Sequence, residues 1–315
     1  MNKNKLKKIL LIAITVIGVG IVATGSYAWQ VFTSAITNIQ EEIEYKKTEK
    51  RMEEINLAEG DPITVLLMGI DEPEDEEDIY QRSDTLILLT LNPHEQTTHM
   101  VSIPRDTYTE IIGQGTKEKI NHAYAYGGTE MTIRTLETFL DVPVDYFVKI
   151  NMDGFKDIVD AVDGIEVNND FAFTYGGVEF KEGYNQLNGK EALLYARMRQ
   201  DDPRGDFGRQ ERQRQVIEGV VDKGTTLKGI TSSVSNFKEV IEAVEGNVRT
   251  NLDVQEMWKI QSNYRGAFNN VIEHEILGEE TEINETYYFV PNEEKVQELS
   301  EELNGQLKEQ YGKQQ

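Results

Sequence analysis

Residues 9–29 contain no charged side chain, and this stretch limits the folds open to the rest of the chain. At about 1.5 Å per residue, a helix over it would be roughly 31 Å long, enough to cross a bilayer. Four lysines precede it in residues 1–8, and Tyr27 and Trp29 lie at its end. We expect the lysines to stay in the cytoplasm and the aromatic rings to sit at the outer interface. A cleaved signal peptide is the alternative, but its apolar region normally spans only about 7 to 15 residues. We therefore predict an uncleaved, single-pass signal anchor.

The part of the chain beyond this span is strongly acidic. The 315 residues include 32 Lys and Arg against 56 Asp and Glu, a formal net charge of −24. Setting aside the four tail lysines leaves 28 cationic and 56 acidic residues, a net of −28. Such a domain repels nucleic acid, and an anionic ligand would need a local field that opposes the global one. The absence of cysteine excludes disulfides, thiolate metal sites and cysteine nucleophiles.

Strand and helix patterns alternate along the rest of the chain. Short apolar or alternating segments predict strands at 63–70, 85–92, 97–104, 145–151, 271–277 and 286–290. Apolar residues at helical spacing predict helices at 128–141, 152–162, 189–196, 206–223, 231–245 and 253–264. This interleaving predicts an α/β fold in which helices cover a sheet.

The same patterns divide the chain into five parts. We expect a cytoplasmic tail at 1–8, the anchor at 9–29, a polar juxtamembrane helical stalk at 30–60, an extracellular domain at 61–292 and an acidic helix or tail at 293–315. The protein would then lie in the cell membrane, with its folded domain outside the cell.

One short window gathers half of the arginines. Six of the twelve arginines, and none of the twenty lysines, lie in residues 196–214: Arg197, Arg199, Arg204, Arg209, Arg212 and Arg214. Asp206 is a good N-cap for a following helix, on which Arg209, Arg212 and Gln213 would share one face near the anion-attracting N-terminus.

The choice of arginine over lysine in this window suits phosphate. A planar guanidinium makes paired hydrogen bonds to phosphate oxygens and stays charged when partly buried. If residues 196–200 are extended, Arg197 and Arg199 share a side, and four arginines can converge on one ligand. The alternative is a surface helix whose arginines pair with acidic neighbours. The candidate partners are Asp201, Asp202, Glu211 and Glu218.

Two aspartates flank the loop between the first two predicted strands. Asp71 follows the first strand and Asp84 precedes the second, so a hairpin would bring them together. Two carboxylates near arginines suit Mg²⁺, or Mn²⁺, that also holds phosphate oxygens. The alternative is that both residues only cap strands and form turns. Arg105 and Asp106 follow the third strand, and Lys119 lies shortly after it.

Seven segments in this order resemble the LytR–CpsA–Psr family of bacterial envelope proteins. They are GID…RSDT, SIPRDTY, KINHAYAYGG, VDYFVKINMDGF, VDAVDGIEV, LNGKEALLYARMR and GDFGRQERQ, between about residues 63 and 222. The resemblance implies an αβα sandwich, a central mixed sheet flanked by helices, with an apolar cavity for a prenyl chain. It implies transfer of a glycopolymer, such as wall teichoic acid, from a polyprenyl-pyrophosphate carrier to a peptidoglycan hydroxyl.

The resemblance also implies roles for single residues. The residues that would hold the pyrophosphate and stabilise the transferred phosphoryl group are Arg105, Arg197, Arg199 and Arg209. Further ligand contacts would come from Arg82, Lys119, Arg212 and Gln213. Asp71 and Asp84 would hold Mg²⁺, with Asp84 or Asp106 as the general base.

Three other functions remain open at this point. The first is a hydrolase that cleaves the pyrophosphate with water. The second is a non-catalytic lipid-phosphate binding scaffold, which needs the arginines but not the aspartate pair. The third is a membrane-tethered transcriptional regulator, which the eight-residue cytoplasmic tail disfavours because it is too short for a DNA-binding domain.

Overall fold

The computed structural model describes residues 38–43, 50–51, 54–71, 81–226 and 246–308. The predicted tail and membrane anchor and the predicted helix at 231–245 lie outside these residues. Within the described ranges, no helix combines the length and apolar character that a membrane span requires.

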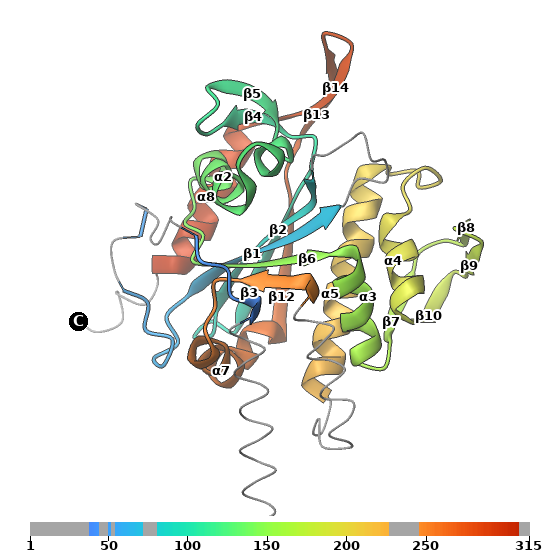
Figure 1. The fold of residues 1–315 in the computed structure, drawn as a ribbon, viewed down its shortest axis with the longest axis horizontal. Coiled ribbons are helices and arrows are strands. Elements are labelled where there is room, and N and C mark those ends of the chain that lie inside the picture. Colours follow the sequence, from blue (N-terminus) through green and yellow to red (C-terminus); the bar gives the residue numbers. More distant parts are fainter. Residues whose placement is uncertain (1–37, 44–49, 52–53, 72–80, 227–245, 309–315) are drawn as a thin grey trace, which may run out of the picture.

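A six-stranded sheet forms the centre of the molecule (Figure 1). Its spatial order is β11 (Val248–Thr250), β6 (Tyr146–Asn151), β1 (Ile63–Asp71), β2 (Arg82–Asn92), β3 (Thr97–Ile103) and β12 (Asn270–Glu275). The β1–β6 and β3–β12 pairs are parallel, whereas the other three are antiparallel. The predicted mixed sheet is therefore confirmed. Five of the six predicted strands belong to it, whereas the strand predicted at 286–290 lies in a separate hairpin.

Helices cover both faces of this sheet, because its central strands bury side chains on both sides. Leu66, Leu88 and Val101 pack under α2 (His122–Leu140) and α8 (Glu293–Lys308). Side chains of the alternate positions pack on the opposite face with α7 (Val254–Asn263) and the 3₁₀ helix η1 (Arg265–Asn269). Each such buried aliphatic side chain contributes about 1.5–3 kcal/mol to the hydrophobic stabilisation.

A third group of elements packs beside the sheet, at the right of Figure 1. It consists of α3 (Met152–Ala161), α4 (Gly189–Arg197), α5 (Asp206–Thr226) and two small hairpins, β7 (Ile165–Asn169) with β10 (Gly183–Leu187) and β8 (Phe173–Tyr175) with β9 (Val178–Phe180). Phe173, Phe180 and Tyr195 stack at its centre. The helices were expected, whereas the hairpins were not predicted from the sequence.

Two more hairpins complete the described part of the chain. They are β4 (Tyr108–Ile111) with β5 (Thr116–Lys119), and β13 (Gly278–Ile283) with β14 (Thr286–Pro291). Helix α8 lies beyond the domain predicted at 61–292, yet Leu299, Leu303 and Leu307 are buried in the same cluster as the sheet. Leu57, from the predicted stalk, is buried on the opposite face. The packed core thus includes residues on both sides of 61–292.

Candidate functional site

A cavity of about 310 Å³ opens where β1 ends and β2 begins. Its lining comes from the sheet, from the segment after β3 and from α3, β8, α4 and α5: Asp71, Asp84, Thr85, Arg105, Met152, Tyr175, Ala196, Arg197, Arg199, Gln200, Arg209 and Gln213. Four arginines and two aspartates give this wall a formal charge of +2. The cavity is therefore a local cationic site in a chain of net charge −24.

The two aspartates reach the cavity because the β1–β2 ladder is irregular at its end. Gly69 pairs with Thr85, but Ile70 pairs with Ser83, so Asp84 is an extra residue in the ladder. Such a bulge re-aims the side chain of the unpaired residue. Asp71 pairs in register with Arg82 and lines the same cavity. The expected meeting of the hairpin ends is thus present, with Arg82, not Asp84, directly opposite Asp71.

Arg197 and Arg199 lie on the opposite wall, at the end of α4. The helix ends at Arg197, and Met198 adopts an extended conformation, with φ −60° and ψ 130°. Both arginines line the cavity, and their side chains are 36% and 38% exposed. Their carboxylate contacts are long: Arg197 Nη2 lies 3.8 Å from Asp71 Oδ2, and Arg199 Nε lies 3.9 Å from Asp206 Oδ1. Both guanidiniums are therefore on the cavity wall, where an anionic ligand would meet them.

Arg209 is the deepest cation of the cavity wall. Its side chain is 8% exposed, and its Nη2 lies 2.7 Å from Asp206 Oδ1. Burial lowers the pKa of Arg209, and the charges of Arg105 and Arg199 lower it further against the opposing effect of Asp206. Its Nε is buried without a hydrogen-bond partner. A buried donor of this kind is costly to leave unpaired, so an anionic ligand that accepts from it would relieve the cost.

Arg105, in the segment after β3, lines the cavity and pairs with Asp84 of β2. Its guanidinium donates to the Asp84 carboxylate, whose other oxygen accepts from Asn121 Nδ2 at 3.2 Å. Burial alone would lower the pKa of Arg105, but the carboxylates of Asp84, Asp106 and Asp206 raise it above its usual value. Arg105 is therefore a fixed positive charge beside Asp84.

Arg212 does not line the cavity. Its side chain is 3% exposed; Nη1 lies 2.5 Å from Asp202 Oδ2, Nε donates to the Tyr195 carbonyl at 3.0 Å, and Nη2 donates to the Met198 carbonyl. Successive helix residues are about 100° apart, so Gln213 faces the cavity with Arg209 while Arg212 turns toward α4. Arg212 thus holds the end of α4 that carries Arg197 and Arg199.

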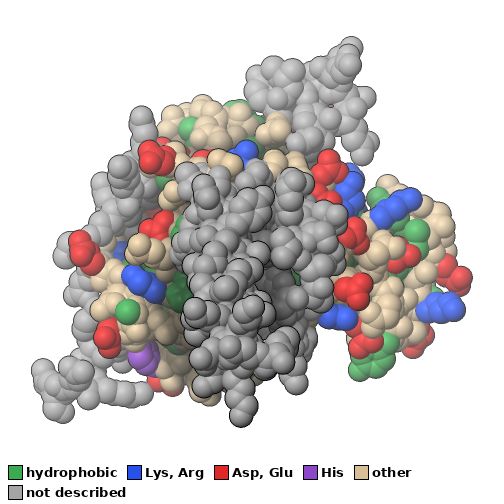
Figure 2. Space-filling model, turned by 60° about the horizontal axis from the view of Figure 1, so that its bottom comes forward, with side chains coloured by type: hydrophobic (Ala, Val, Ile, Leu, Met, Phe, Trp, Pro, Cys, Tyr) green, Lys and Arg blue, Asp and Glu red, His purple; other side chains and the backbone are tan. Residues whose placement is uncertain are grey.

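The six arginines of the window therefore divide into two equal groups. Arg197, Arg199 and Arg209 line the cavity, whereas Arg204, Arg212 and Arg214 make structural ion pairs. Arg204 pairs with Glu211 and Asp170, and Arg214 Nε lies 2.5 Å from Glu273 on β12. The ion-pair alternative therefore describes half of the window, and the other half lines the cavity. On the face of the molecule that Figure 2 shows, the side chains of Asp and Glu lie among those of Lys and Arg.

The Asp202–Arg212 pair predicts a large stability effect. The Asp202 side chain is fully buried, and α5 lies so close that a Cβ on Gly208 would stand 1.8 Å from Asp202 Oδ2. Asp202→Ala leaves Arg212 buried without its carboxylate, and we expect a loss of about 3–5 kcal/mol in the free energy of unfolding. Urea unfolding followed by circular dichroism measures it. Asp201→Ala, at the exposed neighbour, is the control, and equal unfolding midpoints would contradict the structural role.

The same pair predicts how this contribution depends on pH. Burial alone would raise the pKa of Asp202, but hydrogen bonds and charge from Arg212 and Arg204 bring it below its ordinary value. A carboxyl with a depressed pKa stabilises the fold above its unfolded pKa and loses that contribution as pH falls through the folded value. The difference in stability between the wild type and Asp202→Ala should therefore shrink at strongly acidic pH.

The structure places the remaining predicted residues around the cavity. Gln213 lines it, whereas Arg82 is exposed on β2. Lys119 donates to Asp106 at 2.7 Å and lies outside the lining. Asp106 borders a separate narrow space beside Asp206 and Tyr287. Of the two candidate bases, Asp84 is therefore the one on the cavity wall.

Five lining residues were missed by the sequence reasoning. Ala196 directly precedes a predicted site residue, and Thr85 and Gln200 directly follow one, so their position along the chain could have indicated them. Met152 and Tyr175 come from α3 and β8, and their apolar or aromatic side chains carry no signal for a site. The helix predicted at 206–223 begins at Asp206 as expected, but Asp206 is its first residue and not its N-cap, because the Gly205 carbonyl accepts from Arg209 N at 3.3 Å.

The donor set of the aspartate pair fits a hard divalent cation. Asp71 and Asp84 supply carboxylate oxygens only, and both side chains are partly exposed to the cavity, at 29% and 18%. Mg²⁺ prefers oxygen ligands and commonly binds one or two carboxylates together with water and substrate phosphates. The residues present therefore fit Mg²⁺ or Mn²⁺ and do not fit a thiophilic metal.

The chain is similar to known proteins along most of its length. A model of the LytR_cpsA_psr family matches residues 26–305. The chain is 50% identical over 309 residues to the polyisoprenyl-teichoic acid–peptidoglycan teichoic acid transferase TagU of Bacillus subtilis (strain 168), covering 97% of this chain and 98% of that protein.

Solved structures share the fold over most of their length. The crystal structure of B. subtilis TagU is 51% identical, with a TM-score of 0.62, over 79% of this chain and 97% of that one. A structure described as TagT bound to LIIa-WTA is 32% identical, with a TM-score of 0.69, over 83% and 96% of the two chains. The expected mixed sheet flanked by helices is the fold of these proteins.

Proposed function

The chain belongs to the LytR–CpsA–Psr family, and from that premise we propose that it is the transferase that moves teichoic acid from a polyprenyl carrier to peptidoglycan. The TagU relatives carry this activity in their names at 50% identity over nearly the full length of both chains. The protein is thus a cell-envelope enzyme, as the seven sequence motifs led us to expect.

The proposal depends on the arginine wall, by which we mean the four arginines that line the cavity: Arg105, Arg197, Arg199 and Arg209. A polyprenyl pyrophosphate presents several charged oxygens, and the acidic domain would repel it everywhere except at a cationic cavity. Arg105, Arg197, Arg199 and Arg209 provide that cavity, and the buried Nε of Arg209 offers a donor that the protein itself leaves unpaired. Hydrogen bonds to charged groups contribute about 1.5–3 kcal/mol each.

The proposed step is a phosphoryl transfer. The oxygen of a peptidoglycan hydroxyl attacks the phosphorus that bears the glycan, and the bond from that phosphorus to the bridging oxygen breaks. The bridging oxygen leaves with polyprenyl phosphate, and the proton of the hydroxyl passes to a base, for which Asp84 is placed on the cavity wall. The arginines stabilise the charge that develops on the transferred and leaving oxygens.

Asp71 and Asp84 would hold Mg²⁺ beside this wall. When bound, the ion supplies charge withdrawal from the phosphate oxygens. The long Arg197–Asp71 contact and the Arg105–Asp84 pair keep both carboxylates at the cavity. The two arginines also offset the negative charges of the two carboxylates. Asp71 and Asp84 can therefore both line the cavity when no Mg²⁺ is bound.

The prenyl chain would leave the cavity along its least polar side. Met152, Tyr175 and Ala196 are the apolar side chains of the lining, and they come from α3, β8 and α4. These elements pack around the aromatic cluster of Phe173, Phe180 and Tyr195. An apolar path on this side would place the pyrophosphate at the arginines and the lipid tail toward the helices.

A transfer assay with labelled glycan on a polyprenyl-pyrophosphate carrier tests the function. With peptidoglycan present, label should move to the insoluble fraction as polyprenyl phosphate appears. If soluble glycan phosphate forms equally fast without peptidoglycan, the protein is a hydrolase. Binding of the carrier with neither product would show a scaffold. Either result would replace the transferase assignment.

Topology gives a separate prediction for the location of the domain. Because four lysines precede the uncharged span 9–29, we expect the chain beyond Trp29 to lie outside the cell. Protease added to intact protoplasts should remove the folded domain within the time that digests a known surface protein. A cytoplasmic marker protein should survive as the control. Full protection of the domain would reverse the topology and separate the protein from its peptidoglycan acceptor.

A further inference from the structure

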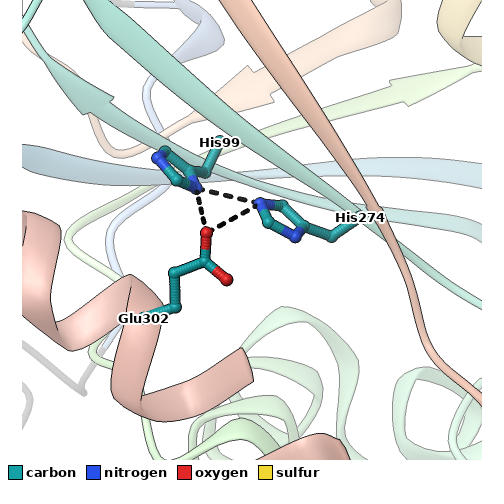
Figure 3. Close-up of side chains that lie close together, drawn as sticks. All are labelled: His99, His274 and Glu302. Atoms are coloured by element: carbon teal, nitrogen blue, oxygen red, sulfur yellow. Dashed lines mark hydrogen bonds and ion pairs between the residues drawn. The ribbon is translucent and has the colours of Figure 1, made fainter. Parts of the chain in front are cut away.

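Two of the chain's four histidines meet an acidic side chain outside the lining of the arginine cavity (Figure 3). His99 lies on β3, His274 on the edge strand β12, and Glu302 on α8. Ile272 pairs with His99 across the parallel strands, so His274, two residues on, shares its face of the sheet. That face is the one that α8 covers.

The three side chains present one ligand atom each toward a common point. His99 Nδ1 lies 2.9 Å from His274 Nε2 and 3.6 Å from Glu302 Oε1, and His274 Nε2 lies 3.9 Å from the same oxygen. In a tetrahedral zinc site with bonds of about 2.0–2.1 Å, neighbouring ligand atoms are roughly 3.3 Å apart. The three observed separations differ from that value by about 0.3–0.6 Å, so a small movement of the side chains would close the triangle around a zinc ion.

We propose that His99, His274 and Glu302 form a Zn²⁺ site that fastens the C-terminal helix α8 to the sheet. Two imidazoles and one carboxylate are a common zinc donor set, and a three-ligand site leaves a fourth position for water. The Glu302 side chain is 50% exposed, so solvent and ions reach the site from the helix side.

The surroundings of His99 support metal over a simple hydrogen bond between the rings. Its side chain is 4% exposed, and its Nε2 is buried without a hydrogen-bond partner. Thr90, its direct neighbour in register on β2, also has a buried hydroxyl without a partner. Metal on Nδ1 would place the ring proton on Nε2, and such protons are normally donated to a neighbouring acceptor. Thr90 carries the neighbouring hydroxyl, although the structure shows no hydrogen bond between the two atoms.

Both imidazoles have a pKa below the ordinary value, which favours the neutral form that binds metal. Burial and the neighbouring His274 lower the pKa of His99, and burial lowers the pKa of His274, against the opposing effect of Glu302. Neutral imidazole is the ligand species, so no proton need be displaced at neutral pH. The ion would join residues that are 175 positions apart, and closing so long a loop makes a crosslink strongly stabilising.

The test is zinc content and thermal stability of the full-length chain in detergent, purified without a histidine tag. After dialysis against trace Zn²⁺, elemental analysis should find one zinc per chain, and 1 mM Mg²⁺ should not displace it. Co²⁺ in its place should give the visible absorption of a tetrahedral site. Zn²⁺ at about 100 times its dissociation constant should raise the Tm by roughly 5 °C.

Matched variants decide between this site and any other. His274→Gln should lose the zinc and the Tm shift. Glu302→Gln should weaken binding by at least the roughly 10- to 100-fold that loss of an outer ligand partner costs. Without metal, the Tm of Glu302→Gln should equal that of the metal-free wild type. Equal values would exclude misfolding as the cause of the weaker binding. Glu301→Gln, on the same helix, and His122→Gln should bind as the wild type does. No stoichiometric zinc, or unchanged binding in His274→Gln and Glu302→Gln, would overturn the proposal.

Discussion

Replacing Arg197 or Arg199 by lysine should nearly abolish transfer of teichoic acid while the fold stays intact. Both side chains line the cavity and are more than a third exposed, so lysine fits without a packing cost. Lysine keeps the charge but loses the planar pair of donors that matches phosphate oxygens. Loss of a transition-state arginine costs about 10³–10⁵ in rate in other phosphoryl-transfer enzymes. The measurement is the initial rate of label transfer to peptidoglycan.

Arg204→Lys is the matched control for this experiment. Arg204 lies in the same window, but it pairs with Asp170, Asp202 and Glu211 on the outside of α5. Ion pairs at exposed positions contribute only about 0–1 kcal/mol, so this variant should transfer at a near wild-type rate. Equal activity of all three lysine variants would mean that Arg197 and Arg199 supply general charge only.

The sequence predicted most of the central sheet because the local pattern and the final burial agree there. The strand at 63–70 is apolar throughout, and in the structure β1 is buried on both faces. The helix at 152–162 carries apolar residues at helical spacing and appears as α3, capped by Asn151. The strand is indicated by a short apolar run bounded by turn residues, and the helix is indicated by its helical spacing.

The details of the cavity depend on features that periodicity does not carry. Asp84 reaches the wall through an irregular register with β1, and a bulge has no signature in the pattern of apolar residues. Arg212 shares a helical stripe with Arg209, yet a buried carboxylate and two carbonyls hold it on the side of α4. Spacing placed these arginines on one face, but only the packing of α4 against α5 decides which of them meets the ligand.

Asp84→Asn should reduce transfer by at least roughly 10²-fold and leave lipid pyrophosphate binding in place. The change keeps the size of the side chain and its bond from Asn121, but it removes half of the charge that would hold Mg²⁺. A bound metal contributes several kcal/mol to phosphoryl transfer, and each 1.36 kcal/mol is about tenfold in rate. The arginine wall remains, and Arg105 loses its ion pair with Asp84 but keeps its contact with Asp106. Transfer and carrier binding should be measured in the same preparation.

EDTA makes this experiment specific for metal. The wild type should lose activity in EDTA and regain it with Mg²⁺ or Mn²⁺, because the donors are all oxygen. Asp84→Asn should start from the low rate and respond little to either treatment, whereas Asp201→Asn, exposed beside the cavity segment, should behave as the wild type. If the wild type transfers equally fast in EDTA, or if Asp84→Asn is active, charge stabilisation rests on the arginines alone. Asp84 and Asp71 would then serve to hold Arg105 and Arg197 in position, which their ion pairs already allow.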